Sequence, residues 1–82
     1  MKTRKREYGH INIIGKYVEK LRKERGIKQK DFISQIQLMG VDINPTSYSK
    51  LEGQVRIATD KEVYVIAQIL KVKIEELFET GI

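Results

Sequence analysis

The sequence predicts a compact all-α domain of five helices, and three observations support this fold class. Apolar residues recur three and four positions apart along most of the chain, which is the spacing of one helix face. Helix-start signals precede several of these segments, and glycines follow them where a helix would end. At 82 residues the chain has room for one small domain, whose modest core helices build economically.

A basic arm precedes the first helix. Lys2, Arg4, Lys5 and Arg6 offer little that a core could bury, so we expect residues 1–11 to be flexible in the free protein. Such an arm can lie along DNA or reach into a minor groove. It can equally be an idle tail, and we give the two interpretations equal weight.

The first helix is predicted to run from Asn12, acting as its N-cap, to Arg25. Gly26 then offers the left-handed residue that commonly ends a helix. Arg22 lies on or beside the apolar face, where a charge needs an acidic partner. The apolar positions are Ile14, Tyr17, Val18, Leu21 and, just past the end, Ile27.

The second helix is predicted from Lys28 to about Met39, with Gly40 ending it. Gln29 lies in its first turn, where backbone N–H groups and the helix dipole favour a phosphate. The alternative for Gln29 is a simple exposed helix former. The buried face is expected to comprise Phe32, Ile33 and Ile36, with Leu38 or Met39 near the end.

The start of the third helix is specified in three ways. Asn44 is a good N-cap, and Pro45 at the first helical position loses no hydrogen bond. Ile43 and Tyr48 have the spacing of a hydrophobic staple. We expect this helix to end at residue 51 or 52, with Tyr48 and Leu51 facing inward.

The outward positions of this third helix are small or cationic, and all can form hydrogen bonds. A short helix with such a leading edge, next to a preceding helix, is the part of a helix-turn-helix that enters the major groove of DNA. The alternative is that serine and threonine gather here only as capping residues. The residues concerned are Thr46, Ser47, Ser49 and Lys50.

The fourth helix has the clearest start signal, because Thr59 and Glu62 match a capping box. Its broad apolar surface indicates either a central position in the domain or burial by a partner, and the first is the stronger interpretation. A fifth, short helix is predicted over residues 74–78, with Leu77 and Phe78 closing the core. The apolar positions of the fourth helix are Val63, Tyr64, Val65, Ile66, Ala67, Ile69 and Leu70.

The composition argues against several kinds of site. The chain has no cysteine, so disulfides and thiolate metal sites are excluded, which suits a reducing cytosol. His10 is the only histidine and makes no metal site alone. No nucleophile and base are paired, no glycine loop cradles a phosphate, and the Glu75-Glu76 pair is typical of a charged helix face. We expect a cytoplasmic protein that is not an enzyme, with no cofactor, no small-molecule ligand and no membrane-spanning or signal segment.

The net charge of +5 is unevenly distributed. Residues 1–10 carry +3 and residues 11–30 carry +5, whereas residues 31–56 carry −1 and residues 57–82 carry −2. A solvated helix face explains any single lysine. The concentration of cations at the front of the chain indicates an electrostatic footprint for nucleic-acid phosphates.

Three segments together resemble the lambda-repressor and Cro-like family of helix-turn-helix proteins, also called the XRE family. They are IGKYVEKLRKERGIKQ, YSKLEGQVR and TDKEVYVIAQILKVKIEELF, and the likeness covers nearly all of residues 13–78. The resemblance implies a compact five-helix lambda-repressor-like DNA-binding domain over residues 12–79, followed by a short tail at 80–82. It also implies that the second and third helices form the unit that reads DNA.

The resemblance assigns roles to individual residues. Gln29 would contact a phosphate and buttress the third helix, and Gln54 and Arg56 would lie near phosphates. An ion pair of Arg22 with Glu52 would fix the first helix against the third. The full set expected at DNA is Lys28, Gln29, Asn44, Pro45, Thr46, Ser47, Ser49, Lys50, Gln54 and Arg56, with possible arm contacts from Lys2, Arg4, Lys5 and Arg6.

Two features depart from the family pattern. Gln29 and Asn44 are fifteen positions apart, more than in the commonest members, so we expect a longer second helix and a larger turn around residues 37–41. Pro45 stands where a side chain that reads bases is frequent. Base contacts would then fall to serine, threonine and Lys50, and hydroxyl groups specify bases weakly.

The function expected from these observations is sequence-specific binding of double-stranded DNA without chemistry. A homodimer would place its third helices in successive major grooves of a palindromic site. Repression of a promoter is the main expectation, and activation is the less frequent alternative, in a bacterial or phage-encoded, nucleoid-associated protein. The rival hypothesis is a protein-interaction module of antitoxin or adaptor type, which would use the fourth helix and residues 79–82 and bind DNA only nonspecifically. A single-strand binder is disfavoured, because most aromatic residues are needed in the core.

Overall fold

The computed structural model describes residues 11–78, which form four α-helices and one short 3-10 helix. The α-helices are α1 (Gly15–Glu24), α2 (Gln29–Leu38), α3 (Pro45–Glu52) and α4 (Asp60–Leu70), and the 3-10 helix is η1 (Ile74–Phe78). No strand occurs within residues 11–78. The prediction of an all-α fold is therefore confirmed.

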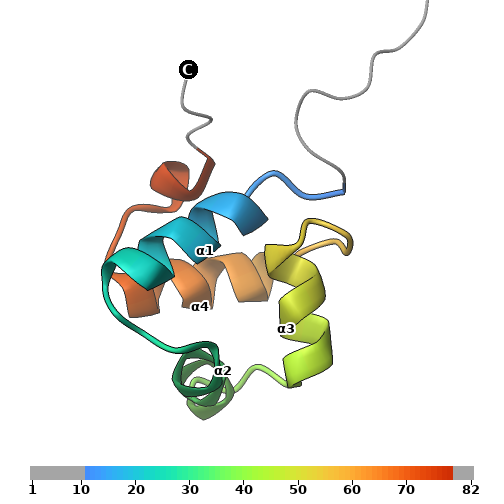
Figure 1. Cartoon of the computed structure of the whole chain (residues 1–82), viewed down its shortest axis with the longest axis vertical. Coiled ribbons are helices and arrows are strands. Elements are labelled where there is room, and N and C mark those ends of the chain that lie inside the picture. Colours follow the sequence, from blue (N-terminus) through green and yellow to red (C-terminus); the bar gives the residue numbers. More distant parts are fainter. Residues whose placement is uncertain (1–10, 79–82) are drawn as a thin grey trace, which may run out of the picture.

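The helices enclose one core, with α4 in a central position (Figure 1). α4 contacts α1, α2 and η1, while α3 contacts α1 and α2. In the view of Figure 1, α1 and α4 cross the middle of the domain, α2 lies at the lower end, and α3 runs along the right side. This arrangement leaves one long side of α3 away from the other helices.

Every helix contributes side chains to the core. Phe32 of α2 and Tyr48 of α3 are completely buried, and their rings meet in a tilted arrangement with centroids 5.7 Å apart. Such a tilted pair is a favourable aromatic geometry. The buried apolar residues are Ile14, Val18, Phe32, Ile33, Ile36, Ile43, Tyr48, Leu51, Val65, Ile66, Ala67, Leu70 and Leu77.

The predicted helix starts at α3 and α4 are confirmed. Asn44 accepts a hydrogen bond from the N–H of Ser47 at 2.7 Å, with Pro45 in the first turn. At α4, both halves of the capping box between Thr59 and Glu62 are present. These bonds satisfy backbone N–H groups that have no partner inside the helix.

The start of α1 differs slightly from the prediction. The regular helix begins at Gly15, not directly after Asn12. The side chain of Asn12 nevertheless accepts a hydrogen bond from the N–H of Gly15, the first residue of the helix, at 2.7 Å. Asn12 therefore satisfies one of the free N–H groups at the start of α1, as an N-cap residue does. The intervening residues form a bend that carries the chain into the helix.

The expected number of helices needs correction. Residues 74–78 form a 3-10 helix, so the described chain has four α-helices and not five. A segment of five residues is too short for a stable ladder of α-helical hydrogen bonds, and 3-10 geometry is common in such short pieces. Leu77 is fully buried there, whereas Phe78 is exposed and does not close the core as predicted.

The end of α2 also differs from the prediction. Leu38 is 86% exposed and Met39 is exposed as well, although one of them was expected in the core. α2 ends at Leu38, and Gly40 turns the chain with a φ of 93°. Ile43, just beyond this turn, enters the core instead.

Both predicted terminal segments lie outside the described residues, apart from Ile11. They are the basic arm, with Lys2, Arg4, Lys5 and Arg6, and the tail at 80–82. The structure therefore describes only residues 11–78, between the arm and the tail.

Candidate nucleic-acid interface

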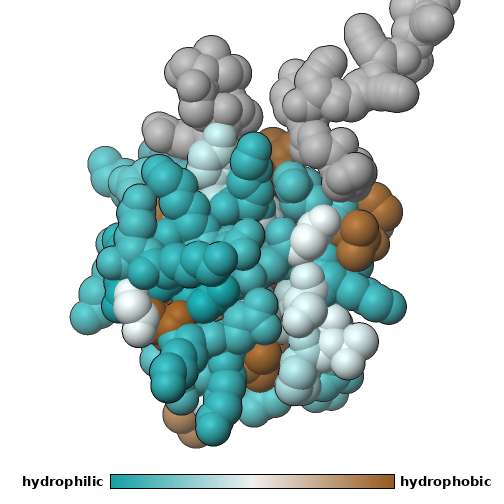
Figure 2. Space-filling model, viewed as in Figure 1, coloured by the Kyte–Doolittle hydropathy of each residue, from teal (hydrophilic) through white to brown (hydrophobic). Residues whose placement is uncertain are grey.

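α3 has one buried face and one open face. Tyr48, Leu51 and Glu52 are buried, and they turn one side of the helix towards the core. In Figure 2 the surface in the region of α3 is pale, as expected for small residues of intermediate hydropathy. The open side consists of Pro45, Thr46, Ser49 and Lys50, which are exposed, and Ser47, which is half-buried.

The first turn of α2 is hydrogen-bonded to α3. The side chain of Gln29 donates to a carboxylate oxygen of Glu52 at 3.0 Å, and its carbonyl oxygen lies 3.5 Å from the hydroxyl of Ser49. Lys28, the N-cap of α2, is exposed beside it. The structure thus brings Gln29 to the side of α3 that carries Ser49, with Lys28 next to it in the chain.

Arg22 and Glu52 form the ion pair that the family resemblance implied. The Nε atom of Arg22 donates to Glu52 at 2.7 Å and Nη2 donates at 3.2 Å, while Nη1 donates to the carbonyl oxygen of Ile27 at 2.7 Å. Their side chains are only 7% and 5% exposed. The hydroxyl of Tyr48 also donates to Glu52. Three residues, Arg22 of α1, Gln29 of α2 and Tyr48 of α3, therefore donate to one buried carboxylate.

The network controls the charge of its members. Burial by itself would raise the pKa of Glu52, but hydrogen bonds from Arg22, Tyr48 and Gln29 outweigh it and hold this pKa below its ordinary value. Burial raises the pKa of the Tyr48 phenol, and the adjacent Glu52 carboxylate raises it further. Glu52 is thus ionised and Tyr48 neutral at neutral pH.

Gln54 and Arg56, expected near phosphates, have partners inside the protein. Gln54 has a φ of 64° and donates from its side chain to the carbonyl oxygen of Asn12 at 3.1 Å. Arg56 donates to two backbone carbonyl oxygens and to both carboxylate oxygens of Glu62. Both side chains connect the loop after α3 to neighbouring segments.

The family resemblance implied the Arg22–Glu52 pair, but the sequence did not reveal how closely the start of α1 approaches the end of α3. Asn12 is buried and donates to the carbonyl oxygens of Leu51 at 3.1 Å and Arg56 at 2.7 Å. A Cβ atom on Gly15 would lie 2.2 Å from the carbonyl oxygen of Leu51. A glycine in the first turn of a lysine-rich helix was the available signal, because glycine is unfavourable there without a packing reason.

The exposed lysines of α1 are partly offset by acids. Lys20 lies 3.5 Å from Glu24, and Lys23 lies 3.0 Å from Glu19, both at helical i, i+4 spacing. Exposed pairs of this kind contribute little stability. Glu19 and Glu24 therefore reduce the net positive charge that α1 adds to the front of the chain.

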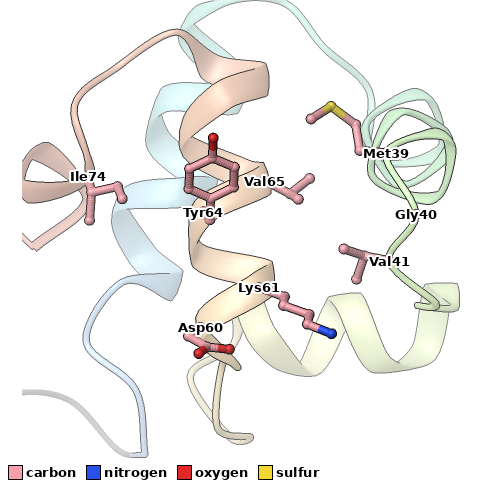
Figure 3. A pocket seen from close by; sticks show the side chains of 8 residues that line it. All are labelled: Met39, Gly40, Val41, Asp60, Lys61, Tyr64, Val65 and Ile74. Atoms are coloured by element: carbon pink, nitrogen blue, oxygen red, sulfur yellow. The ribbon is translucent and has the colours of Figure 1, made fainter.

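A second surface feature is a groove between α4, the turn after α2 and the start of η1 (Figure 3). Tyr64 is 55% exposed on its wall, and Met39 and Ile74 are exposed too. In Figure 3, Met39 and Val41 lie across the groove from the helix that carries Tyr64 and Val65. Asp60 and Lys61 give the groove a charged end.

Within residues 11–78, no cluster of three or more histidine, cysteine, aspartate or glutamate residues is placed to hold a metal ion. No helix in the same part of the chain is both long and apolar enough to cross a membrane. Comparison with protein-family models, with curated proteins and with solved structures gives no match for this chain.

Proposed function

We propose that this protein is a sequence-specific regulator that binds double-stranded DNA through a lambda-repressor-like helix-turn-helix formed by α2 and α3. The observation that carries the proposal is the open edge of α3. Its polar residues project from a helix whose other side is fixed to α1 and α2 through Glu52. A rigidly held helix with a polar, cationic edge suits the major groove.

The proposed contacts fall into two groups. Thr46, Ser47, Ser49 and Lys50 would reach base edges and the adjacent backbone, and hydroxyl groups give only weak base discrimination. Lys28 and Gln29, at the start of α2, would contact a phosphate. Specific binding therefore depends strongly on phosphate position and DNA shape.

The proposed mechanism is occupancy of a promoter by two copies. A two-fold axis would place the two α3 helices in successive major grooves, about 10 base pairs apart from centre to centre. Repression follows when the bound dimer blocks access to the promoter. No bond is made or broken in this mechanism, and no cofactor enters it.

The first test is selection of duplexes from a random double-stranded DNA pool by the purified protein, with binding of the winner measured against salt. An enriched inverted repeat that binds far better than random DNA supports a dimeric, sequence-specific regulator. A pool that stays random, with binding that disappears steeply as salt rises, indicates phosphate contacts alone and contradicts the proposal.

The assigned surface can be tested with three substitutions. Lys50→Ala and Ser47→Ala should weaken binding to the selected duplex while leaving the thermal unfolding curve nearly unchanged, because both side chains lie on the open edge of α3. Glu76→Ala, on the exposed side of η1, is the matched control and should bind like the wild type. Equal effects from all three would rule out the assigned face.

The groove beside Tyr64 favours a second candidate function, a protein-interaction module on the same fold. Exposed Tyr64, Met39 and Ile74 offer apolar area of the kind found in protein interfaces. In that case Tyr64→Ala would abolish partner binding, and the DNA selection would remain random. The two functions thus give opposite results in the first test.

A further inference from the structure

Arg56 lies in the loop between α3 and α4, and its guanidinium group donates hydrogen bonds to two backbone carbonyl oxygens and to one carboxylate. Nε donates to the carbonyl oxygen of Ser47 at 3.1 Å, and Nη1 donates to the carbonyl oxygen of Ile57 at 2.6 Å. Nη1 and Nη2 also donate to the two carboxylate oxygens of Glu62, at 2.9 and 2.7 Å. This forked geometry uses the directional donors that distinguish arginine from lysine.

These bonds connect the first turns of two helices. Ser47 belongs to the first turn of α3, and Glu62 belongs to the first turn of α4. Glu62 also accepts a hydrogen bond from the backbone N–H of Thr59 at 2.9 Å, as part of the capping box. Arg56 therefore ties the beginning of α3 to a helix start that is itself fixed by its cap.

The opposite end of α3 has separate attachments. Glu52 is held by Arg22 and Gln29, and the carbonyl oxygen of Leu51 accepts from Asn12. Without Arg56, the first turn of α3 would depend on its own cap and on core packing. The contacts of Arg56 thus add a constraint at the end of the helix where the open polar edge begins.

The charge of Arg56 is also compensated. Burial would raise the pKa of Glu62, but hydrogen bonds from Arg56 and from the Thr59 backbone hold it below its ordinary value, so the carboxylate is charged at neutral pH. The Arg56 side chain is 21% exposed and that of Glu62 is 7% exposed. A neutralised and largely enclosed guanidinium is a poor ligand for a DNA phosphate.

We propose that Arg56 is a positioning residue that sets the placement of the α3 open edge through Ser47 and Glu62, and that it does not itself bind DNA phosphate. This inference rests on the proposed DNA-binding function. It differs from the role that the family resemblance implied for Arg56, which was a position near phosphates as part of the DNA-binding set.

The two roles predict different responses to substitution. If Arg56 positions α3, then Arg56→Lys and Glu62→Gln should both weaken DNA binding, because either change breaks the forked pair. If Arg56 binds phosphate, Arg56→Lys should bind almost normally. Glu62→Gln should then bind equally well or more tightly, since it frees a cation and removes a nearby negative charge.

The experiment measures binding of these variants to the duplex selected by the wild type, over a series of salt concentrations. We expect both variants to lose about tenfold in affinity, a typical effect for residues that act without touching the ligand. The slope of log affinity against log salt should stay at the wild-type value, because each lost phosphate contact would lower it by about one. Thr59→Ala is the matched control, since it weakens the α4 cap and spares the Arg56–Glu62 pair.

A second measurement needs no DNA. In backbone amide NMR spectra of the free protein, Arg56→Lys and Glu62→Gln should both shift the signals of residues 45–50, whereas Thr59→Ala should shift mainly those at the start of α4. Unshifted α3 signals in the first two variants would overturn the proposal, whatever the DNA results. A shallower salt slope for Arg56→Lys, or wild-type affinity for Glu62→Gln, would overturn it as well. Failure of the wild type to select any sequence would contradict the proposed function separately.

Discussion

Two arginine–glutamate pairs hold the opposite ends of α3, and they differ in their surroundings. The Arg22–Glu52 pair joins the end of α3 to α1, with side chains 7% and 5% exposed. The Arg56–Glu62 pair connects the start of α3 to α4, and its arginine is 21% exposed. The shortest nitrogen–oxygen distance is 2.7 Å in both pairs. The pairs therefore differ in how far their charged groups are removed from water, and not in how closely these groups approach each other.

The comparison shows what burial does to an ion pair. Taking charges from water costs much of the attraction they gain, so neither pair need add much net stability as a whole. Breaking the deeper pair is still costly, because it leaves an uncompensated buried charge. The deeper pair therefore mainly fixes the orientation of α1 against α3, whereas the more exposed pair tolerates disruption with a smaller loss.

The largest effect is expected from Arg22→Ala. This change leaves Glu52 buried without its main partner and should lower the free energy of unfolding by about 3–5 kcal/mol. Thermal and urea unfolding followed by circular dichroism would measure it. Lys20→Ala, on the exposed side of α1, is the control and should change stability by less than about 0.5 kcal/mol. A melting temperature close to that of the wild type would show that the buried pair does not form.

A somewhat smaller effect is expected from Gly15→Ala, which tests the same contact between α1 and α3 without altering any charge. The added Cβ would lie 2.2 Å from the carbonyl oxygen of Leu51, so the helices must separate. Overpacking of this kind costs about 1–3 kcal/mol, more than the helix propensity of alanine returns. Urea unfolding measures the loss. A stabilised Gly15→Ala protein would show that α1 does not approach α3 so closely.

The last and most discriminating prediction is that the stability contributed by both pairs depends on pH. The pKa values of Glu52 and Glu62 both lie below the ordinary value in the folded protein. Their contribution to stability is therefore present above the carboxyl pKa of the unfolded chain, and it is lost as pH falls through the folded values. Glu52→Gln should be much less stable than the wild type at neutral pH, and the difference should shrink on acidification.

Glu62→Gln should also approach the wild type in stability as the pH falls. Its loss of stability at neutral pH should be smaller than that of Glu52→Gln, since its partner Arg56 is more exposed. Urea unfolding from about pH 7 down to about pH 3 would record both differences. Parallel curves for the wild type and Glu52→Gln would contradict a charge-based role for this pair. If Glu62→Gln lost more stability at neutral pH than Glu52→Gln, the Arg56–Glu62 pair would be the more important of the two for stability, contrary to this prediction.

Most of the helical framework was predictable from the sequence, because the relevant signals act within a single turn. The cap at Asn44 and the capping box at Thr59 each depend on residues three positions away, and both are present as predicted. The errors occurred where helix ends meet the core. Leu38 was expected on the buried face of α2, but it is exposed at the end of the helix. Ile43, which follows the turn, is buried in the core.

The candidate interface was predictable only in part. The open edge of α3 follows from the position of its cap and from helical spacing, which is local information. The partners of Gln54 and Arg56 depend on the path of the loop after α3. Gln54 adopts a positive φ there, and no glycine marks that position in the sequence.

By itself the sequence determined the all-α class, the starts of α3 and α4 and the residues that face outward on α3. These features depend on side chains and backbone groups within one helical turn of each other. The tertiary structure alone decided the close approach of Gly15 to Leu51 and the enclosure of Arg56 by Ser47 and Glu62. Both require segments from different helices to meet, and a hydrogen-bond donor in the sequence does not specify which distant acceptor the fold will bring to it.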